Sequence, residues 1–322
     1  MKNKLFLFVR IAISFTLIGL ILWLLRDKLP DIVETIANAD RGFLLLGFFT
    51  FLFAVLAIGI RLQKVISVQG IHLSAKEALY LTFIGYFFNN FLPTSIGGDL
   101  VKAYYAGKKV DKKAAAFAGV FMDRFLAMIP FTLIPAVTLL FYSHRIDSKP
   151  MIALIYILFF SCIGLLWLLM HKNTVKYLAF ILEPFKEKLW QKRLRQGYGF
   201  LHIYSKHKMI LLWSFGLSVL TQMTMAVSVF LFSKAVGITG VGLGIFFIVV
   251  PIVGVMSLIP SLNGLGIREG AFVYMLKSYM LPEQAFAISI LFLASLITFG
   301  IIGGIIYALK KNLFTFNMGD LK

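Results

Sequence analysis

The sequence has few of the residues on which soluble enzymes depend. Only 14% of its 322 residues are charged, whereas soluble domains average about a quarter. Its single cysteine, Cys162, excludes an intramolecular disulfide. None of its five histidines has cysteine or acidic partners at metal-ligand spacing. The chain also lacks a P-loop, a GxSxG motif and a dinucleotide-binding fingerprint, so we expect neither a metal nor a cofactor.

Acidic residues are scarce as well, and 32 Lys and Arg against 14 Asp and Glu give a formal net charge of +18. In a soluble protein this excess would suggest nucleic acid, but no nucleic-acid-binding motif accompanies it. Instead, 60% of the residues are hydrophobic, and they form long runs. We therefore predict an all-α polytopic integral membrane protein without a nucleic-acid partner, in which the excess charge belongs to cytoplasmic loops.

A series of apolar segments predicts the membrane helices. They cover residues 5–25, 42–60, 78–92, 114–142, 151–170, 209–232, 241–259 and 285–309. A helix needs about 20 apolar residues to cross the bilayer core, and most of these segments suffice. The first segment has no small-residue cleavage site after it, so we interpret it as an uncleaved span and not as a signal peptide.

The distribution of lysine and arginine predicts on which side each connecting segment lies. Residues 26–41 contain more acidic than basic residues and are predicted to be external, whereas residues 173–208 are strongly basic and predicted to be cytoplasmic. Segments 61–76 and 102–113 are basic too, so both are predicted to be cytoplasmic. Because one crossing would place these two segments on opposite sides, we expect residues 78–106 to enter from the cytoplasm, break and return.

The same reasoning predicts that residues 241–280 enter from the outside and return there. The chain would then have about six full spans and two Pro/Gly-broken re-entrant helical hairpins, with both termini in the cytoplasm. We expect residues 1–322 to form a single transmembrane domain. Within it, residues 173–208 are basic and amphipathic, which suits a helix in the headgroup region as well as an ordinary cytoplasmic loop.

The two hairpins break at similar sequences, "FLPTSIGGDLVKAYY" at residues 91–105 and "LIPSLNGLGIREGAFVYML" at residues 258–276. In each, an apolar helix ends at a proline, closely spaced glycines follow, and a short charged helix begins. The candidate site residues are Pro93, Gly97, Gly98, Asp99 and Lys102 in the first break, and Pro260, Asn263, Gly264, Gly266, Arg268 and Glu269 in the second. Because the two hairpins are predicted to open to opposite sides, the pattern indicates an inverted repeat.

Breaks of this kind suit a binding site. Proline removes a backbone donor, and glycine permits close approach of a backbone. Unpaired N–H groups cannot face lipid, so they must be buried in protein or line a wet cavity. The first turn of the returning helix also attracts anions. The alternative is that Asp99 and Glu269 only cap the helices that follow the glycines.

Asp123 and Arg124 are two further charges inside a predicted span. Such charges are costly in a bilayer and normally face partners in the interior of the bundle. Each is therefore predicted to pair with an opposite charge on a hairpin. The predicted partners are Lys102 or Arg268 for Asp123, and Asp99 or Glu269 for Arg124. A purely structural ion network is the alternative.

Three motifs of the chain resemble the lysylphosphatidylglycerol synthase transmembrane-region family, also called flippase-like proteins. They are the paired glycines with Asp99 and Lys102, the Asp123–Arg124 pair, and "NGLGIREG" at residues 263–270. The resemblance implies a polytopic inner-membrane protein. In the best understood members, the membrane region moves an aminoacylated lipid to the outer leaflet, and a fused cytosolic domain performs aminoacyl transfer. That domain is not recognisable here, and Lys102 stands where the family motif has arginine, which loses the bidentate grip on phosphate.

These observations predict a flippase-like protein that translocates an anionic or aminoacylated phospholipid, or a lipid-linked headgroup, across the inner membrane. Lys102, Arg268 and backbone N–H groups would hold the phosphate, while the carboxylates would balance charge or bind an amine. Two alternatives stay open: a non-transporting membrane subunit of a lipid-modifying or glycosyl-transfer system, and an intramembrane enzyme that uses Asp123 as acid or base. A lipid-modifying enzyme as partner and a homo-oligomer also stay open.

Overall fold

The computed structural model describes residues 26–91, 97–142, 149–171, 199–257 and 264–310, together with residues 19, 23, 197, 259 and 261. Within these residues every element is a helix, which confirms the all-α prediction. Five of the described helices are long and apolar enough to cross a membrane. They are α3 (Arg41–Ser67), α6 (Lys113–Tyr142), α7 (Lys149–Met170), α10 (Lys208–Ala235) and α13 (Pro282–Leu309). The remaining predicted span, residues 5–25, lies almost entirely outside the described residues.

The predicted broken segments form two pairs of shorter helices. In the first pair, α4 (Ala75–Phe91) packs against α5 (Gly97–Lys109), and in the second, α11 (Leu243–Met256) packs against α12 (Ile267–Leu276). The remaining short elements are the 3-10 helix η1 (Arg26–Lys28), α2 (Leu29–Ala37) and the 3-10 helix η3 (Ile203–Lys206). Residues 92–96 and most of 258–263, where the pairs turn, lie outside the described part of the chain, as do most of residues 173–208.

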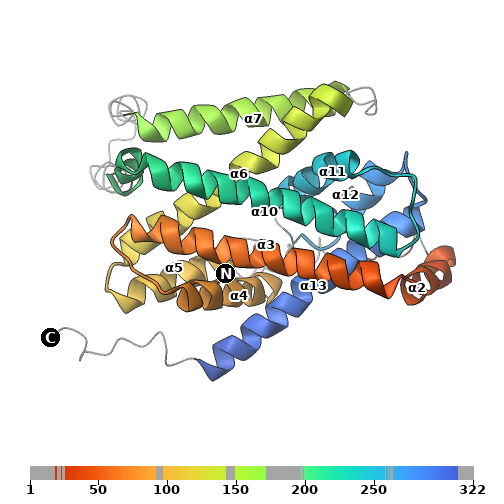
Figure 1. The fold of residues 1–322 in the computed structure, drawn as a ribbon, viewed down its shortest axis with the longest axis horizontal. Helices are drawn as coiled ribbons and strands as arrows, with labels where there is room; N and C mark the ends of the chain where they lie inside the picture. The colour runs from red at the N-terminus through yellow and green to blue at the C-terminus, as the bar shows by residue number, and fades with distance from the viewer. Residues whose placement is uncertain are drawn as a thin grey trace, which may run out of the picture.

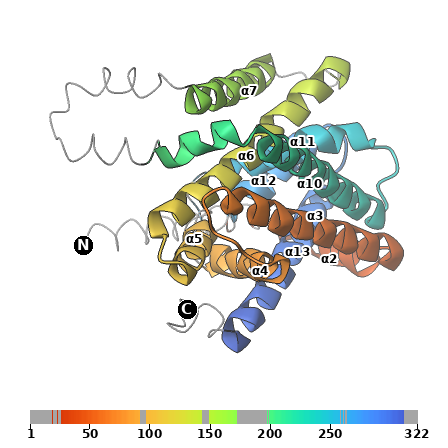
Figure 2. The same ribbon diagram turned by 60° about the vertical axis from the view of Figure 1, so that its left-hand side comes forward.

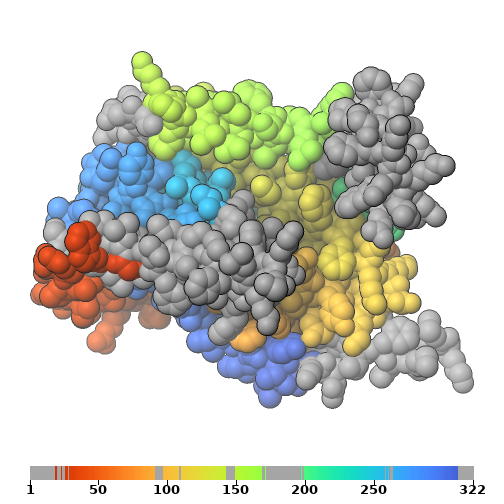
Figure 3. Space-filling model, turned by 180° about the vertical axis from the view of Figure 1, so that it is seen from behind, coloured from red at the N-terminus to blue at the C-terminus, as the bar shows by residue number. Residues whose placement is uncertain are grey.

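The two helix pairs lie at opposite ends of a bundle whose long axis follows α3 and α10. In Figure 1 the α4–α5 pair occupies the left end and the α11–α12 pair the right, while α7 lies at the edge beside α6, as Figure 2 also shows. The view from behind separates the pairs in the same way (Figure 3). This is the arrangement that the charge pattern predicts for two oppositely oriented hairpins.

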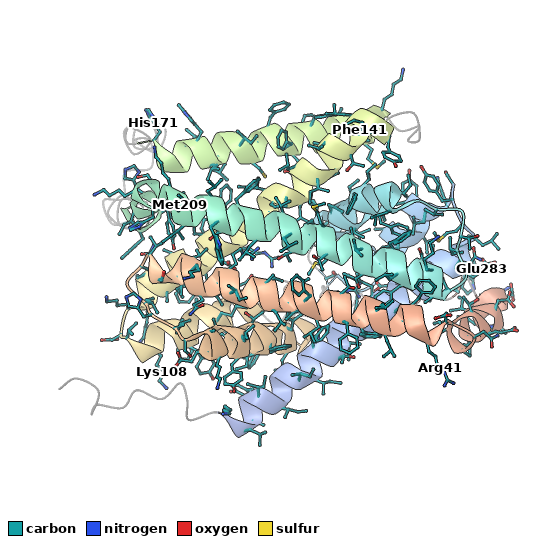
Figure 4. All side chains as sticks on the ribbon, viewed as in Figure 1. Arg41, Lys108, Phe141, His171, Met209 and Glu283 are labelled. Carbon is teal, nitrogen blue, oxygen red and sulfur yellow. The ribbon has the colours of Figure 1, made fainter. Side chains whose placement is uncertain are left out.

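The ends of the long helices follow the predicted sidedness as well. Lys108, His171 and Met209, which border the basic segments, lie at one end of the bundle in Figure 4. Arg41 and Glu283 lie at the other end. Segments predicted to share one side of a membrane therefore lie at one end of the molecule. That the short pairs turn back within a membrane stays a prediction.

Close contacts at glycine hold the bundle together. A Cβ atom on Gly47 of α3 would overlap the ring of Phe232 in α10, and Ser228 of α10 donates a hydrogen bond to the Gly47 carbonyl at 2.8 Å. A Cβ atom on Gly303 of α13 would overlap the backbone carbonyl of Phe83 in α4. Small residues let the backbones approach closely, which drives helix association where lipid is as apolar as the side chains.

The helix α3 continues to Ser67 and so includes residues that were predicted to form a cytoplasmic loop. The extension is helical because Val65 and its apolar neighbours are fully buried in the core. Tyr204 of η3 donates a hydrogen bond to the Val65 carbonyl at 2.9 Å. Burial raises the pKa of the Tyr204 phenol above its ordinary value, so the phenol stays protonated and remains a donor. The extension also makes Arg61 a helical residue that is only 4% exposed.

Candidate functional site

The first helix of the site, α5, begins directly against α4. A Cβ atom on Gly98 would overlap the carbonyl oxygen of Gly85 in α4, so only glycine permits this approach. The N–H group of Gly98 donates to the Asn89 side-chain oxygen at 2.7 Å. An asparagine at the end of α4 therefore satisfies one of the free N–H groups at the start of α5. Gly97 is buried beside Gly98 in the same first turn.

Asp99 lies in the first turn of α5, where it meets two cations. Lys102 Nζ lies 2.9 Å from its Oδ1 atom, and Arg124 Nη1 lies 3.4 Å from its Oδ2 atom. The stem of Lys102 reaches Asp99 by passing over Gly85, where a Cβ atom would overlap it. The predicted pairing of Arg124 with Asp99 is confirmed. The capping contact described for α5 comes from Asn89 and not from Asp99.

The prediction that Asp123 pairs with Lys102 or Arg268 is wrong. Asp123 of α6 instead accepts two hydrogen bonds from Arg61 of α3, from Nε at 2.7 Å and from Nη2 at 3.2 Å. Arg61 Nη1 also donates to Ser218 Oγ of α10 at 2.9 Å. The pair thus joins three long helices. Sequence reasoning missed it because Arg61 was placed in a loop beyond the end of a helix.

The second break forms a buried ion pair at the start of α12. Gly264 and Gly266 have φ values of +77° and +82°, which L side chains rarely adopt. Glu269 accepts a hydrogen bond from the Gly266 N–H at 2.6 Å, so it caps α12 as the alternative interpretation proposed. Its other oxygen accepts from Arg268, from Nη2 at 2.7 Å and from Nε at 3.0 Å. Both side chains are 2% exposed. The candidate residues Pro93, Pro260 and Asn263 lie outside the described residues.

Residues from both helix pairs line a cavity of about 150 Å³. Arg124, which contacts Asp99 of α5, and Arg268 of α12 both line it. Asn89 of α4 and Gln222 of α10 add amide groups to the wall, and aromatic rings such as Phe131 and Phe292 complete it. Lys102 does not line this cavity; its ammonium group lies on Asp99.

Gln222 was not singled out from the sequence. It is 3% exposed and lines the cavity, and its Nε2 atom has no hydrogen-bond partner within the described residues. A buried amide of this kind is costly unless something satisfies it. Its signal in the sequence is a single amide within a span whose other polar side chains are those of serine and threonine. The tertiary structure is what shows that Gln222 lines the same cavity as the two arginines.

A second cavity, of about 110 Å³, adjoins the first, since Arg124, Phe131 and Gly254 line both. Its remaining wall is largely apolar and includes Leu158 and Cys162 of α7. This helix, α7, lies at the edge of the bundle. Among the described helices, its main contact is with α6. The polar cavity thus adjoins an apolar one that lies against the outermost helix.

The sequence pattern of the lysylphosphatidylglycerol synthase TM region matches residues 7–304. The chain belongs to this family. The match covers both helix pairs and every residue that lines the two cavities. The chain is therefore a multi-pass membrane protein of a lysylphosphatidylglycerol synthase-related family, as the motifs indicated. A search of curated proteins found no match.

Proposed function

We propose that this member of the lysylphosphatidylglycerol synthase TM-region family is a lipid translocase. It binds an anionic or aminoacylated phospholipid, or a lipid-linked headgroup, and moves it across the inner membrane. The observation that supports this best is the cavity in which Arg124, beside the first helix pair, and Arg268, from the second, line one space.

Two arginines on one cavity suit a phosphate group. A guanidinium presents several N–H donors in a planar fork that matches phosphate oxygens in bidentate fashion. Both arginines are already oriented by carboxylates, Asp99 for Arg124 and Glu269 for Arg268. Side chains held in this way lose less entropy when a ligand binds. Asn89 and Gln222 supply further groups for hydrogen bonds to a headgroup.

The adjoining apolar cavity suits the hydrocarbon part of a lipid. It contacts α7, the outermost helix, so a lipid could enter from the bilayer between α6 and α7 with its headgroup directed toward Arg124. Transport then follows from alternating access. The helix pairs at the two ends move in turn and open the shared cavity first to the cytoplasmic side and then to the outer side. Both termini face the cytoplasm in this arrangement.

Reconstitution with a fluorescent phospholipid tests the proposal. Replacing both cavity arginines, Arg124→Gln and Arg268→Gln, should slow translocation by at least about tenfold, because each removes charge-assisted hydrogen bonds to the phosphate. Arg41→Gln is the matched control, since Arg41 is an exposed arginine at the far end of α3 and away from the cavity. The measurement is the rate at which labelled lipid crosses the bilayer of proteoliposomes.

Unchanged translocation in the double variant would contradict the assignment of the site. If the wild-type chain binds lipid but moves none, it is a non-transporting subunit of a lipid-modifying or glycosyl-transfer system. Formation of a modified lipid by the purified chain would instead indicate an intramembrane enzyme.

A further inference from the structure

The charged side chains around the cavity do not balance. Four buried or half-buried cations accompany three buried carboxylates among the described residues of the site, which leaves one positive charge. The cations are Arg61, Lys102, Arg124 and Arg268, and the carboxylates are Asp99, Asp123 and Glu269. An uncompensated charge in a low-dielectric interior is costly. A bound ligand of opposite charge would remove this cost.

Each of the three carboxylates is already engaged by a cation. Asp123 is held by Arg61 through both of its oxygens. Glu269 uses one oxygen for Arg268 and the other for the Gly266 N–H group. Asp99 holds Lys102 through Oδ1, and its Oδ2 atom, which accepts no hydrogen bond within the described residues, lies 3.4 Å from Arg124 Nη1. Among the described residues of the site, a ligand ammonium group would therefore meet only carboxylates that already form an ion pair with a cation.

The surplus charge lies on the cavity side. Two cations share Asp99, so this is where one positive charge is left over. Of these two, Arg124 lines the cavity, and its side chain is 34% exposed. The contact between Arg124 and Asp99, at 3.4 Å, is also longer than those of the other ion pairs in the site. Arg124 is thus the cation of this pair whose guanidinium is accessible to a ligand in the cavity.

A second observation points to a ligand with acceptor oxygens. The buried Nε2 atom of Gln222 lacks a hydrogen-bond partner within the described residues, and Gln222 lines the same cavity as Arg124 and Arg268. An amide N–H group is a donor, so an oxygen of a phosphate or of a hydroxyl group would satisfy it.

We propose that the site selects a lipid phosphodiester with a single negative charge and an uncharged, hydroxyl-bearing headgroup, and that it discriminates against aminoacylated headgroups. This inference rests on the proposed function and names its substrate class. The ammonium groups of an aminoacyl ester would lie beside Arg124 and Arg268 without a carboxylate to bind them. Like charges brought together in a water-poor site oppose binding and so give specificity.

The test compares two lipids in proteoliposomes made of phosphatidylcholine and the full chain. One probe is acyl-labelled fluorescent phosphatidylglycerol, and the other is its lysyl ester. We expect the first lipid to cross the bilayer at least about tenfold faster, which corresponds to a modest difference in binding free energy. Equal or faster movement of the lysyl ester would overturn this inference and leave the proposed function intact. Movement of neither lipid would overturn the proposed function as well.

Variants of Gln222 test whether the charge balance is the cause. Gln222→Glu adds one carboxylate to the cavity wall, so it should slow phosphatidylglycerol, speed the lysyl ester and reduce the preference by at least about tenfold. Gln222→Met is the matched control, because it removes the amide without adding charge: it should slow both lipids but retain the preference between them. If Gln222→Glu does not fold, Arg124→Gln is the second variant. It changes the net charge of the site by the same amount, because it removes one positive charge, and it should reduce the preference too. A preference that survives these charge changes would overturn the inference.

The same vesicles distinguish a lipid phosphate from free phosphate. Radiolabelled inorganic phosphate should not enter the vesicles faster than it enters vesicles without protein. Uptake of phosphate in the absence of lipid movement would overturn the assignment of the site to a lipid headgroup.

Discussion

Asp123 and Arg124 are adjacent in the sequence but have different partners. Neighbouring residues of a helix point about 100° apart around its axis. Asp123 faces α3, where it holds Arg61, whereas Arg124 faces Asp99 of α5 and the cavity. A single orientation of α6 about its axis therefore allows both the Asp123–Arg61 and the Arg124–Asp99 ion pair. The buried Arg61–Asp123 pair keeps α6 in the rotation about its axis that directs Arg124 toward Asp99 and the cavity.

Removing the carboxylate of this pair should destabilise the protein. Asp123→Asn leaves Arg61 buried without its partner, which typically costs about 3–5 kcal/mol of folding free energy. We expect a clear loss of thermal stability in detergent. The double variant Arg61→Met with Asp123→Leu should recover most of this loss, because apolar side chains of similar size can replace a buried ion pair at little net cost. A double variant as unstable as the single one would contradict this account.

At the scale of elements, glycine decides how closely the helices of a pair approach. Gly98 of α5 lies on the backbone of α4 at Gly85, and this contact aligns its N–H group with Asn89. The stem of Lys102 passes over the same Gly85 on its way to Asp99. The close contact between α4 and α5 is thus what brings the Lys102–Asp99 pair into the interior and Asp99 within reach of Arg124.

A methyl group at Gly98 should disturb this arrangement. The Cβ atom of Gly98→Ala would overlap the Gly85 carbonyl, and overpacking of this kind typically costs about 1–3 kcal/mol. We also expect slower lipid movement, since Asp99 and Arg124 would shift. The control is Gly216→Ala in α10, where an added Cβ meets nothing within 4 Å. That change should leave thermal stability unchanged or slightly higher, because alanine favours a helix. Equal effects of the two substitutions would show that the contact with α4 is unimportant.

At the scale of the whole molecule, the two helix pairs lie at opposite ends of one bundle (Figure 1). Their shared cavity lies where the inner parts of both pairs meet α6 and α10. A chain with a single broken hairpin would expose such a site to one side only. Under the proposed function, two hairpins of opposite orientation would provide a site that opens to either end in turn, as alternating access requires.

Single cysteines test this topology. In a Cys162→Ser background, Lys112→Cys and Lys277→Cys replace two exposed lysines, one after the first helix pair and one after the second. We expect a membrane-impermeant thiol reagent to label them from opposite sides of sealed vesicles, because the two helix pairs are predicted to open in opposite directions. Labelling of both from the same side would exclude the inverted repeat.

Much of the fold and part of the site could be predicted from sequence. The long apolar runs predicted five spans, and most of the predicted ends lie within a few residues of the observed helix ends. The reason is that burial in lipid requires a continuous apolar length. Arg61 was misplaced because hydropathy marks the end of a helix at the first charge, although a paired charge can continue inside it. Gln222 was overlooked because a lone amide carries no periodic signal.

The sequence by itself determined the helical class, the order of the spans and the two glycine-rich breaks, because each of these depends on residues close together in the chain. It also predicted that the basic segments share one side of the membrane. Only the tertiary structure decided that Asp123 binds Arg61 and that Arg124, rather than Lys102, lines the cavity with Arg268 and Gln222. These contacts join helices far apart in the sequence. They depend on the rotation of each helix and on the close backbone approaches that glycine permits.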